Sequence, residues 1–447
     1  MALDLDEPQR RALWARVVEL VSERPSGPLT PTLRDAGALT FDAPRDPSEV
    51  FEDLARGLRE GIVPVGHPAY FGLFNPAPAD VGVMAAALSA AFNPQLATRS
   101  HAPWPVDLER QVLAAFGGRF GFAESEGTFT SGGAEANATA LWVALFSAFP
   151  EAIEGGVRAL PREPVLYVSA DGHATVARAA RLAGLGRTSV RVVPSDRFCR
   201  IKVRALHEAV ARDREAGALP FLIVATVGTT SAGAIDPLEP LAALAARERL
   251  WLHVDAAWGG LAALVPELRP AIAGLERADS ITFDAHKALS SPMGAGMYLS
   301  RRLGALARTF EDRGGYMPRD ASGDPYAHSA QWSRRFIGLP VYAALATVGF
   351  SGYAASLRRQ LALADRLREG LRAQGFSILN DTPLPLVCFA PRDGGDLDAV
   401  ARRIIAEEAG WISVARLASG VRVLRACVDN HRSREDDIDG LLAALAR

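Results

Sequence analysis

Between residues 129 and 300 the chain alternates short apolar runs with segments of helix-forming composition. This alternation is typical of βα units, in which parallel strands form a sheet and the connecting helices cover both of its faces. The pattern predicts an α/β fold with a mostly parallel central sheet. The expected strands are residues 165–169, 189–193, 221–226, 251–254, 280–283 and 296–299.

The flanking segments indicate more than one domain. The chain has 447 residues, and domains commonly have ~150 residues each. An amphipathic helix is expected at 7–23, and strands near 383–390 and 421–428 with helices near 396–408 and 434–446 predict a smaller α+β unit. The predicted division is an N-terminal helical arm (1–55), a large domain (56–310), a polar, Gly/Pro-rich loop that is functional or mobile (311–333), and a helical connection with a small C-terminal domain (334–447).

Composition excludes several classes of function. A net charge of −2 gives no general attraction to nucleic acids or anionic membranes. Cys199, Cys388 and Cys427 are widely spaced and odd in number, which argues against a disulfide framework or a thiolate zinc site. The first residues lack the apolar core of a signal peptide, and no apolar run approaches the ~20 residues of a membrane span. We therefore expect a cytoplasmic protein with no nucleic acid or membrane partner.

The distribution of lysine singles out one position. The chain has 49 lysines and arginines together, but lysine occurs only at 202 and 287. Arginine can replace lysine in most solvated roles, whereas a guanidinium does not form a stable Schiff base with an aldehyde. Lys287 follows the apolar run 280–283, where desolvation favours a nucleophilic amine. Lys202 has no comparable surroundings and is expected to be a solvated residue.

Three further clusters are candidates for chemistry. The stretch TFTSGGAEANATAL (128–141) is a glycine turn that opens into a helix, which favours a bound phosphate. His173 follows one strand and Asp255 ends another. In a doubly wound sheet such strand ends lie at one edge. Together they predict pyridoxal 5′-phosphate, with its phosphate on the glycine turn, its aldehyde on Lys287, its ring nitrogen at Asp255 and its flat face at His173.

Each cluster also has a simpler interpretation. The glycine turn could be a helix N-cap formed by Ser131, His173 a structural histidine and Asp255 a helix cap. A different class of protein, a metal-dependent hydrolase, would use His253 and Asp255 with Asp284 and His286 as ligands, but it leaves Lys287 unexplained. A catalytically silent homologue is a third alternative.

The order of the clusters resembles that of the group II pyridoxal-phosphate-dependent amino acid decarboxylases, which include aromatic-L-amino-acid and glutamate decarboxylases. The similarity runs from about residue 60 to the end of the chain. It is carried by VATVGTTSAGAIDPLEPLAALAARERLWLHVDAAWGG, ADSITFDAHKALSS, HPAYFG, APWPVDLERQVL, QWSRRF and LRACVDNHRSREDDIDGLL. The resemblance implies the aminotransferase-like fold type I and a homodimer with its active site at the interface. It also implies decarboxylation of an L-amino acid to a primary amine and CO₂.

The resemblance assigns a role to each matching residue. Lys287 would form the Schiff base, Asp255 would pair with the pyridine nitrogen, and His173 and Ala257 would cover opposite ring faces. The remaining cofactor contacts would be Gly132, Gly133 and Ala134 at the phosphate, Thr230 near the ring, and His286 beside the Schiff base and the substrate carboxylate.

The loop 311–333 resembles the family's mobile catalytic loop, whose tyrosine protonates Cα. Tyr326 is preferred over Tyr316 because its spacing to Arg334 is closer to that of the family. The alternative outcome on the same scaffold is oxidative conversion of the amino acid to an aldehyde, which this tyrosine suppresses; a retro-aldol carbon–carbon lyase is a weaker alternative.

The chain departs from the family pattern at several positions. Ala288 replaces a frequent tryptophan, and Asp284 stands where animal members have asparagine, which would put a second negative charge near a phosphate. The candidate substrate contacts Phe74, Asn75, Gln95 and Arg99, with Leu73 and Ala97 beside them, are more polar than an aromatic pocket requires. They favour a polar or acidic substrate side chain.

Overall fold

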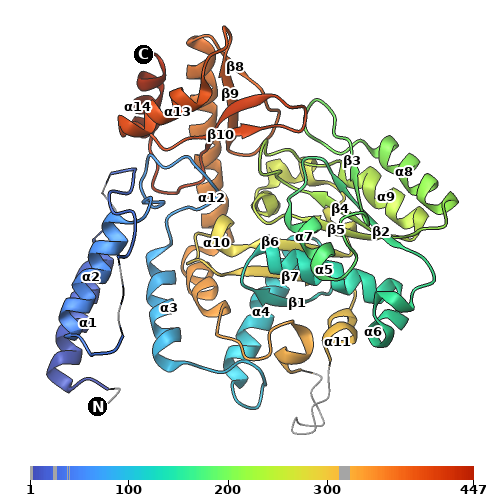
Figure 1. Ribbon diagram of the computed structural model, residues 1–447, viewed down its shortest axis with the longest axis horizontal. Coiled ribbons are helices and arrows are strands. Elements are labelled where there is room, and N and C mark those ends of the chain that lie inside the picture. The colour runs from blue at the N-terminus through green and yellow to red at the C-terminus, as the bar shows by residue number, and fades with distance from the viewer. Residues whose placement is uncertain (1–3, 24–27, 38, 40, 312–322) are drawn as a thin grey trace.

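The computed structural model describes residues 4–23, 28–37, 39, 41–311 and 323–447. Its centre is a seven-stranded sheet in the order β1-β7-β6-β5-β4-β2-β3, with helices on both faces (Figure 1). Strand β7 is antiparallel to both of its neighbours, and the pairs from β6 to β3 are parallel. The predicted α/β fold with a mostly parallel sheet is confirmed. The strands of this sheet are β1 (Glu126–Thr130), β2 (Pro164–Ser169), β3 (Val190–Val193), β4 (Leu219–Thr226), β5 (Trp251–Asp255), β6 (Ser280–Asp284) and β7 (Gly296–Ser300).

A second, antiparallel sheet of four strands, in the order β10-β11-β9-β8, lies in the C-terminal part of the chain. Its strands are β8 (Phe376–Ile378), β9 (Leu386–Pro391), β10 (Ser413–Arg416) and β11 (Arg422–Cys427). The long helix α12 (Gly338–Ala373) leads into this sheet, and it is interrupted at Gly349, where φ is +69°. Together with α13 and α14, the sheet encloses a hydrophobic core of its own.

The other helices connect the strands or precede them. The α-helices are α1 (Glu7–Ser22), α2 (Pro47–Glu60), α3 (Asp80–Phe92), α4 (Pro103–Arg119), α5 (Gly133–Ala148), α6 (Glu151–Gly155), α7 (Thr175–Leu182), α8 (Val203–Glu215), α9 (Leu238–Glu248), α10 (Ala285–Ala288), α11 (Ala305–Phe310), α13 (Leu397–Ala406) and α14 (Glu435–Leu445). The 3-10 helices are η1 (Val157–Ala159), η2 (Gly259–Leu264), η3 (Pro266–Ile272), η4 (Leu275–Arg277) and η5 (Pro325–His328). Within the described ranges no helix is both long and apolar enough to cross a lipid bilayer.

All six strands expected in the large domain form, but three others were missed. β1 has only one large apolar residue, Phe129, and it exists because it pairs with β7 along its whole length. β8 and β10 are short and partly exposed, so their sequences lack a clear alternation. The predicted boundary at residue 55 falls inside α2 and stays a prediction. The other domain boundaries remain predictions.

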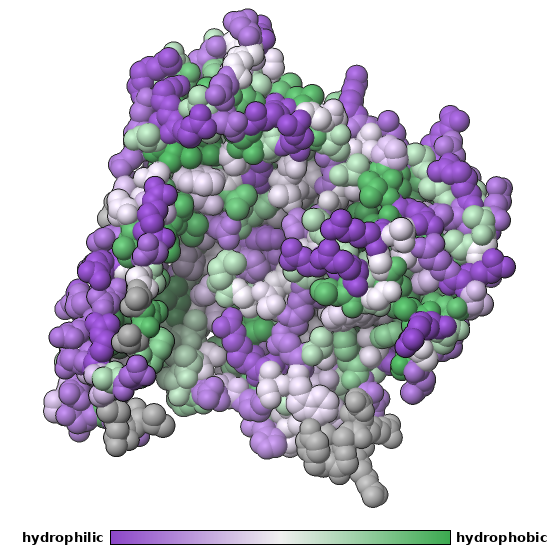
Figure 2. Space-filling view, viewed as in Figure 1, coloured by the Kyte–Doolittle hydropathy of each residue, from purple (hydrophilic) through white to green (hydrophobic). Residues whose placement is uncertain are grey.

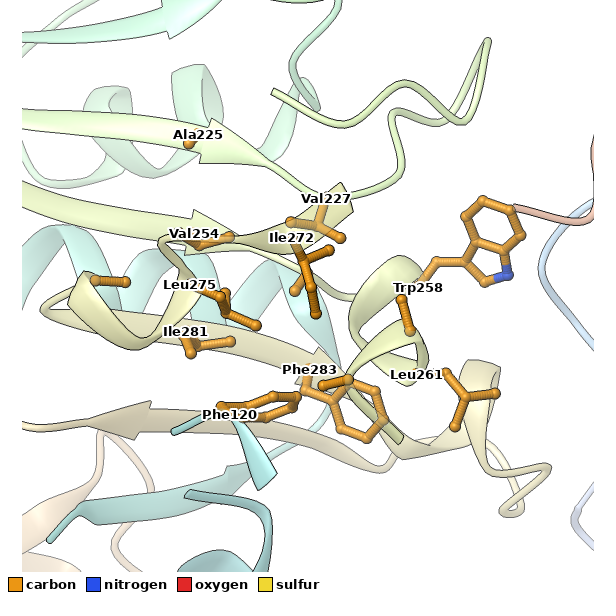
Figure 3. Packing of buried hydrophobic residues seen from close by; sticks show 14 of the residues in the cluster. Phe120, Ala225, Val227, Val254, Trp258, Leu261, Ile272, Leu275, Ile281 and Phe283 are labelled. Atoms are coloured by element: carbon orange, nitrogen blue, oxygen red, sulfur yellow. The ribbon is translucent and has the colours of Figure 1, made fainter. Parts of the chain in front are cut away.

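The central strands β5 and β6 bury two chemically different faces. On one face, Val254 and Ile281 point toward Ile272 and Leu275 of the 3-10 helices, as Figure 3 shows. The other face is covered by α5 and is polar, although it is buried just as deeply. Its side chains are His253, Asp255, Ser280, Thr282 and Asp284. Buried polar groups cost free energy unless they are bonded, so this polar row indicates a functional face.

A buried ion pair links helix α4 to the described segment between residue 323 and the start of α12. Arg334 Nη2 lies 2.7 Å from Glu109 Oε2 in α4, and Glu109 Oε1 accepts a hydrogen bond from the Gly338 backbone N–H at 2.8 Å. Burial raises the pKa of Glu109, whereas Arg334 lowers it. Breaking such a pair leaves a buried charge without its partner, so the start of α12 is firmly anchored.

Candidate active site

The segments that the sequence predicts to carry chemistry meet at one edge of the large sheet. Asp255 is the last residue of β5, and Lys287 lies in α10, directly after β6. His173 lies between β2 and α7, and the turn Gly132–Gly133 joins β1 to α5. Because these strands are parallel, their carboxyl ends lie at the same edge. The tertiary structure therefore brings these four segments together.

Asn137 of α5 is the centre of a buried hydrogen-bond network around Asp255. Its Nδ2 donates to Asp255 Oδ2 at 2.8 Å and to Thr175 Oγ1 at 3.0 Å, and its Oδ1 lies 3.1 Å from His253 Nε2. Asp255 Oδ1 accepts the backbone N–H of Ala257 at 3.1 Å. Both amide hydrogens and the amide oxygen of Asn137 are therefore in use, and the orientation of the Asp255 carboxylate is fixed.

His253 is a neutral part of this network. Burial lowers its pKa to about 4, against the opposing effect of Asp255. Its Nε2 faces the Asn137 oxygen and must carry the proton, while Nδ1 lies 2.9 Å from Ser280 Oγ. With both ring nitrogens bonded inside the protein, His253 does not support the metal-hydrolase alternative. Among the residues that the structure describes, no group of three or more His, Cys, Asp or Glu side chains is arranged to hold a metal ion.

The same network orients His173. Thr175 Oγ1 accepts from Asn137, so its own hydrogen is available to His173 Nδ1 at 2.8 Å. This bond assigns the histidine proton to Nε2 and fixes the plane of the ring. His173 is exposed, and its ring can therefore lie against a flat ligand. Asn137 and Thr175 were not predicted as site residues, and His253 was considered only as a metal ligand of the hydrolase alternative. The signal for its place in this network is that it lies two residues before Asp255 on β5, and therefore on the same face of the strand.

The turn before α5 is closed to any residue but glycine. Gly132 has φ of +152°, and a Cβ there would lie 3.1 Å from His286 Cε1. A Cβ at Gly133 would lie 2.8 Å from Asp284 Oδ2. The N-cap of α5 is Gly132, and no side chain caps the helix, because Ser131 bonds Glu135 instead. The simple Ser131-cap interpretation is therefore wrong, and the N-terminus of α5 is open to an anion.

Lys287 lies beside two of the other predicted groups. Its Nζ is 2.8 Å from Asp284 Oδ2, and His286 Nε2 is 3.7 Å from the same oxygen. The Lys287 side chain is 26% exposed, whereas Asp284 is buried completely. Burial lowers the pKa of His286, and the nearby Asp284 opposes that change. His286 Nδ1 is held 3.0 Å from the carbonyl oxygen of Ala295.

Arg425 of β11 joins two loops at this edge and was not predicted as a site residue. It is buried, its Nε donates to the Thr230 carbonyl at 2.9 Å, and its Nη1 donates to the Gly72 carbonyl. Its guanidinium carbon lies 4.7 Å from the centre of the Phe74 ring. Thr230 itself is exposed. A charged residue in the buried strand β11 was the available signal, since arginine is rarely buried without partners.

The four predicted substrate contacts have different surroundings. Phe74 stacks on Trp258 with 4.1 Å between ring centres, and Asn75 Nδ2 lies 3.5 Å from Met293 Sδ. Gln95 Oε1 accepts the backbone N–H groups of Ala97 and Arg334 and so shapes its own loop. Arg99 forms an exposed ion pair with Asp107, with 2.9 Å between Nη2 and Oδ2. None of these contacts joins Gln95 or Arg99 to the Lys287 cluster.

Of the two candidate loop tyrosines, only Tyr326 lies within the described residues. It belongs to η5 and is buried, and its ring packs on Trp332 with 4.8 Å between ring centres. Its backbone N–H donates to the Ala97 carbonyl at 3.1 Å. Tyr316 lies outside the described residues, so the choice between the two tyrosines stays a prediction.

A buried carboxyl group, Asp429, lines a small cavity of about 20 Å³ together with Lys287, Trp258 and Gln360. Neither of its carboxylate oxygens accepts a hydrogen bond of standard geometry. Burial raises its pKa to about 7, and Arg425 offsets only part of that effect. The folded-state pKa is above that of the unfolded chain. The folded protein therefore holds a proton that the unfolded chain has lost, and stability falls as pH rises from about 4 to about 7.

Replacing Asp429 with asparagine is expected to raise the melting temperature at pH 8, with a smaller gain at pH 5. The difference between the pKa of Asp429 in the folded protein and in the unfolded chain corresponds to at most roughly 4 kcal/mol of folding stability at pH 8. Thermal denaturation at both pH values measures the difference, and Asp436→Asn on the exposed face of α14 is the matched control. An equal effect of Asp429→Asn at the two pH values would contradict the prediction.

The fold and the converging side chains define a class of protein, the fold type I pyridoxal-phosphate enzymes. Comparison with known proteins agrees. A family model, the pyridoxal-dependent decarboxylase conserved domain, matches residues 35–392. The acidic amino acid decarboxylase GADL1 of Bos taurus is 30% identical over 355 residues, which are 77% of this chain and 68% of the relative. The tyrosine decarboxylase of Oryza sativa subsp. japonica is 30% identical over 478 aligned positions, covering 97% of this chain and 89% of the relative.

Solved structures give the same result. The crystal structure of mouse CSAD in its apo form superposes with a TM-score of 0.92 at 25% identity, covering 99% of both chains. The chain belongs to the pyridoxal-dependent decarboxylase family. It is a pyridoxal-phosphate-dependent amino acid decarboxylase, which confirms the family, the reaction and the cofactor expected from the sequence.

The residues present fit pyridoxal 5′-phosphate. The Gly132–Gly133 turn leaves room that a Cβ would fill, and the adjacent N-terminus of α5 favours an anion. Asp255 is a fixed carboxylate suited to a protonated ring nitrogen, and Lys287 would supply the amine for attachment. When bound, the cofactor accepts the electron pair that is released when the bond from Cα to the carboxylate breaks.

Proposed function

We propose that the chain decarboxylates an L-amino acid with a polar side chain, and that acidic side chains are preferred. The reaction would use the residues assigned above. The observation that carries the assignment is the convergence of Lys287, Asp255 and the Gly132–Gly133 turn at one sheet edge. The substrate class is supported by the polar residue Asn75, which follows Phe74 in the predicted substrate region, and by the similarity to an acidic amino acid decarboxylase.

In the proposed reaction each side chain has one task. Lys287 gives up the cofactor to the substrate amine and takes it back afterwards. Asp255 holds a proton on the ring nitrogen, and its own position is held by Asn137. His173 covers one face of the ring and Ala257 the other. Gly132, Gly133 and Ala134 bind the phosphate, Thr230 lies near the ring, and His286 binds the substrate carboxylate.

Product analysis tests the function directly. Purified protein with added pyridoxal 5′-phosphate is incubated with L-amino acids that have acidic, basic, aromatic or uncharged polar side chains. Mass spectrometry is expected to find a primary amine that is lighter than its parent by CO₂, with the highest rate for an acidic or uncharged polar parent. Conversion of aromatic substrates alone would contradict the proposed substrate class. An aldehyde product would show that the enzyme catalyses the oxidative conversion instead.

Replacing Tyr326 with phenylalanine is expected to raise the share of aldehyde among the products by about tenfold or more, because Cα then lacks its proton donor. Aldehyde and amine are quantified after the same number of turnovers. Tyr342→Phe, which removes a hydroxyl from a half-exposed position of α12, is the matched control. If Tyr316→Phe gives the aldehyde and Tyr326→Phe does not, the catalytic tyrosine is Tyr316.

We further propose that the protein is a homodimer with its active site at the interface. On α3, Met84, Leu88 and Phe92 are 62, 55 and 82% exposed and lie four residues apart, so they form one apolar stripe. Helices α1 and α2 lie side by side at the edge of the molecule (Figure 1), and hydrophobic residues line the hollow beside them (Figure 2). A second copy of the chain is the partner that would cover this face.

Sedimentation measures this assembly. The wild-type protein is expected to sediment as a dimer, and Phe92→Asp is expected to increase the monomer fraction and lower activity together. A monomeric and fully active wild type would contradict the proposal.

We also propose a cytoplasmic location, without nucleic acid or membrane partners. The three buried free thiols at Cys199, Cys388 and Cys427 support this location. Cell fractionation tests it.

A further inference from the structure

Asp284 is a buried carboxylate directly beneath the glycine turn. It is completely buried, and its Oδ2 is 2.8 Å from the position that a Cβ at Gly133 would occupy. Its backbone N–H donates to the Ala257 carbonyl at 3.0 Å, which fixes the end of β6 against β5. Neither of its carboxylate oxygens accepts a hydrogen bond of standard geometry. The site assigned to the cofactor phosphate therefore has a negatively charged carboxylate directly beneath it.

The positive charge that balances Asp284 comes from the catalytic lysine. Lys287 Nζ lies 2.8 Å from Oδ2, close enough for an ion pair. His286 Nε2 is farther away, at 3.7 Å, and burial lowers the pKa of His286, which disfavours its charged form. Asp255 at the end of β5 and Glu135 in the first turn of α5 add negative charge at this edge. The Arg425 guanidinium also lies at this edge, but it donates to the carbonyl groups of Thr230 and Gly72.

A phosphate at this turn adds more negative charge than the site can balance. A phosphate monoester carries close to two negative charges above pH 7. The N-terminus of α5 contributes only a partial positive charge, equivalent to roughly half of an elementary charge. The Lys287 ammonium already neutralises the carboxylate. The phosphate charge that is left unbalanced repels the nearby carboxylate in a buried site, unless a proton is shared between the two groups.

We propose that Asp284 couples binding of the cofactor phosphate to uptake of one proton, and so makes cofactor affinity fall as pH rises. The proton is held between the Asp284 carboxyl group and the phosphate oxygens, where it turns a repulsive contact into a hydrogen bond. Asparagine at this position would donate the same hydrogen bond without a proton. The inference rests on the proposed position of the phosphate at Gly132–Gly133.

The test uses ligands that differ only in the phosphate. Pyridoxine 5′-phosphate and pyridoxine have an alcohol in place of the aldehyde, so neither can react with Lys287. Isothermal titration calorimetry in buffers of different ionisation enthalpy counts the protons taken up. Wild-type protein is expected to take up close to one proton more with pyridoxine 5′-phosphate than Asp284→Asn does. Its preference for the phosphorylated ligand should fall between pH 7 and 9, by at most about tenfold for each pH unit.

In Asp284→Asn the preference is expected to be greater than in wild type at pH 9, by tenfold or more, and nearly constant with pH. Asp279→Asn makes the same change of charge beside the opposite end of β6, where Asp279 pairs with Arg302, and is expected to behave as wild type. Asp284→Ala is the second variant if the asparagine form does not fold.

Equal proton uptake and an equal pH dependence in wild type and Asp284→Asn would overturn the inference. So would weaker binding of the phosphorylated ligand by the variant, because the carboxylate would then be supporting the phosphate. A wild-type protein that binds pyridoxal 5′-phosphate without the yellow absorption of a lysine adduct would instead overturn the assigned role of Lys287. The two failures are therefore distinguishable.

Discussion

Replacing Lys287 with arginine is expected to abolish the yellow colour of the protein and to lower kcat by at least about a thousandfold. The guanidinium keeps the positive charge beside Asp284, whose Oδ2 lies 2.8 Å from the lysine amine. It cannot form the covalent bond to the cofactor aldehyde. The substitution therefore separates the chemistry of the amine from its charge.

Absorbance after removal of free cofactor measures attachment, and amine production measures turnover. The matched control is Lys202→Arg, which changes the chain's other lysine at the exposed N-cap of α8. This control is expected to keep both colour and rate. A yellow, active Lys287→Arg protein would show that the amine of Lys287 is not the attachment point.

Replacing Asp255 with asparagine is expected to lower kcat by roughly a hundredfold to ten-thousandfold, with a smaller change in KM. The neutral amide cannot hold a proton on the ring nitrogen, so the ring accepts the electron pair from Cα less readily. The effect falls on the transition state, which explains the larger change in kcat.

The same substitution disturbs the network. Asp255 accepts hydrogen bonds from Asn137 and from the Ala257 backbone on its two oxygens, but an asparagine has only one acceptor. One buried donor is then unpaired, which costs about 1–3 kcal/mol of stability. Thermal denaturation measures this part separately from turnover. Asp255→Glu, which keeps the charge, is expected to retain more activity, and equal losses in both variants would contradict the electrostatic role.

Much of the large domain could be predicted from the sequence because its strands are short apolar runs with strong local signals. β4 and β5 are recognisable in isolation, since burial on both faces selects large apolar residues at most of their positions. β1 could not be predicted in this way. It has a single large apolar residue and begins with Glu126 and Gly127, which are unfavourable in strands. Its partner β7 lies far along the chain.

The individual site residues show a similar division. Lys287 could be found from its rarity and position, and Asp255 from its place at the end of a strand. Asn137 could not, because an asparagine near the start of an alanine-rich helix has no distinguishing local pattern. It becomes the centre of the network only when α5 covers the polar face of β5 and β6.

By itself the sequence determined the alternation of elements, the chemistry of the amine and carboxylate, and the glycines of the turn, because these depend on residue type and local spacing. The tertiary structure decided which charged groups lie close enough to interact. Asp284 and Lys287 are three residues apart, but their balance against a phosphate depends on how close the start of α5 comes to the end of β6. Electrostatic interactions in a buried site depend on distance through space and on the exclusion of water, and packing alone sets both.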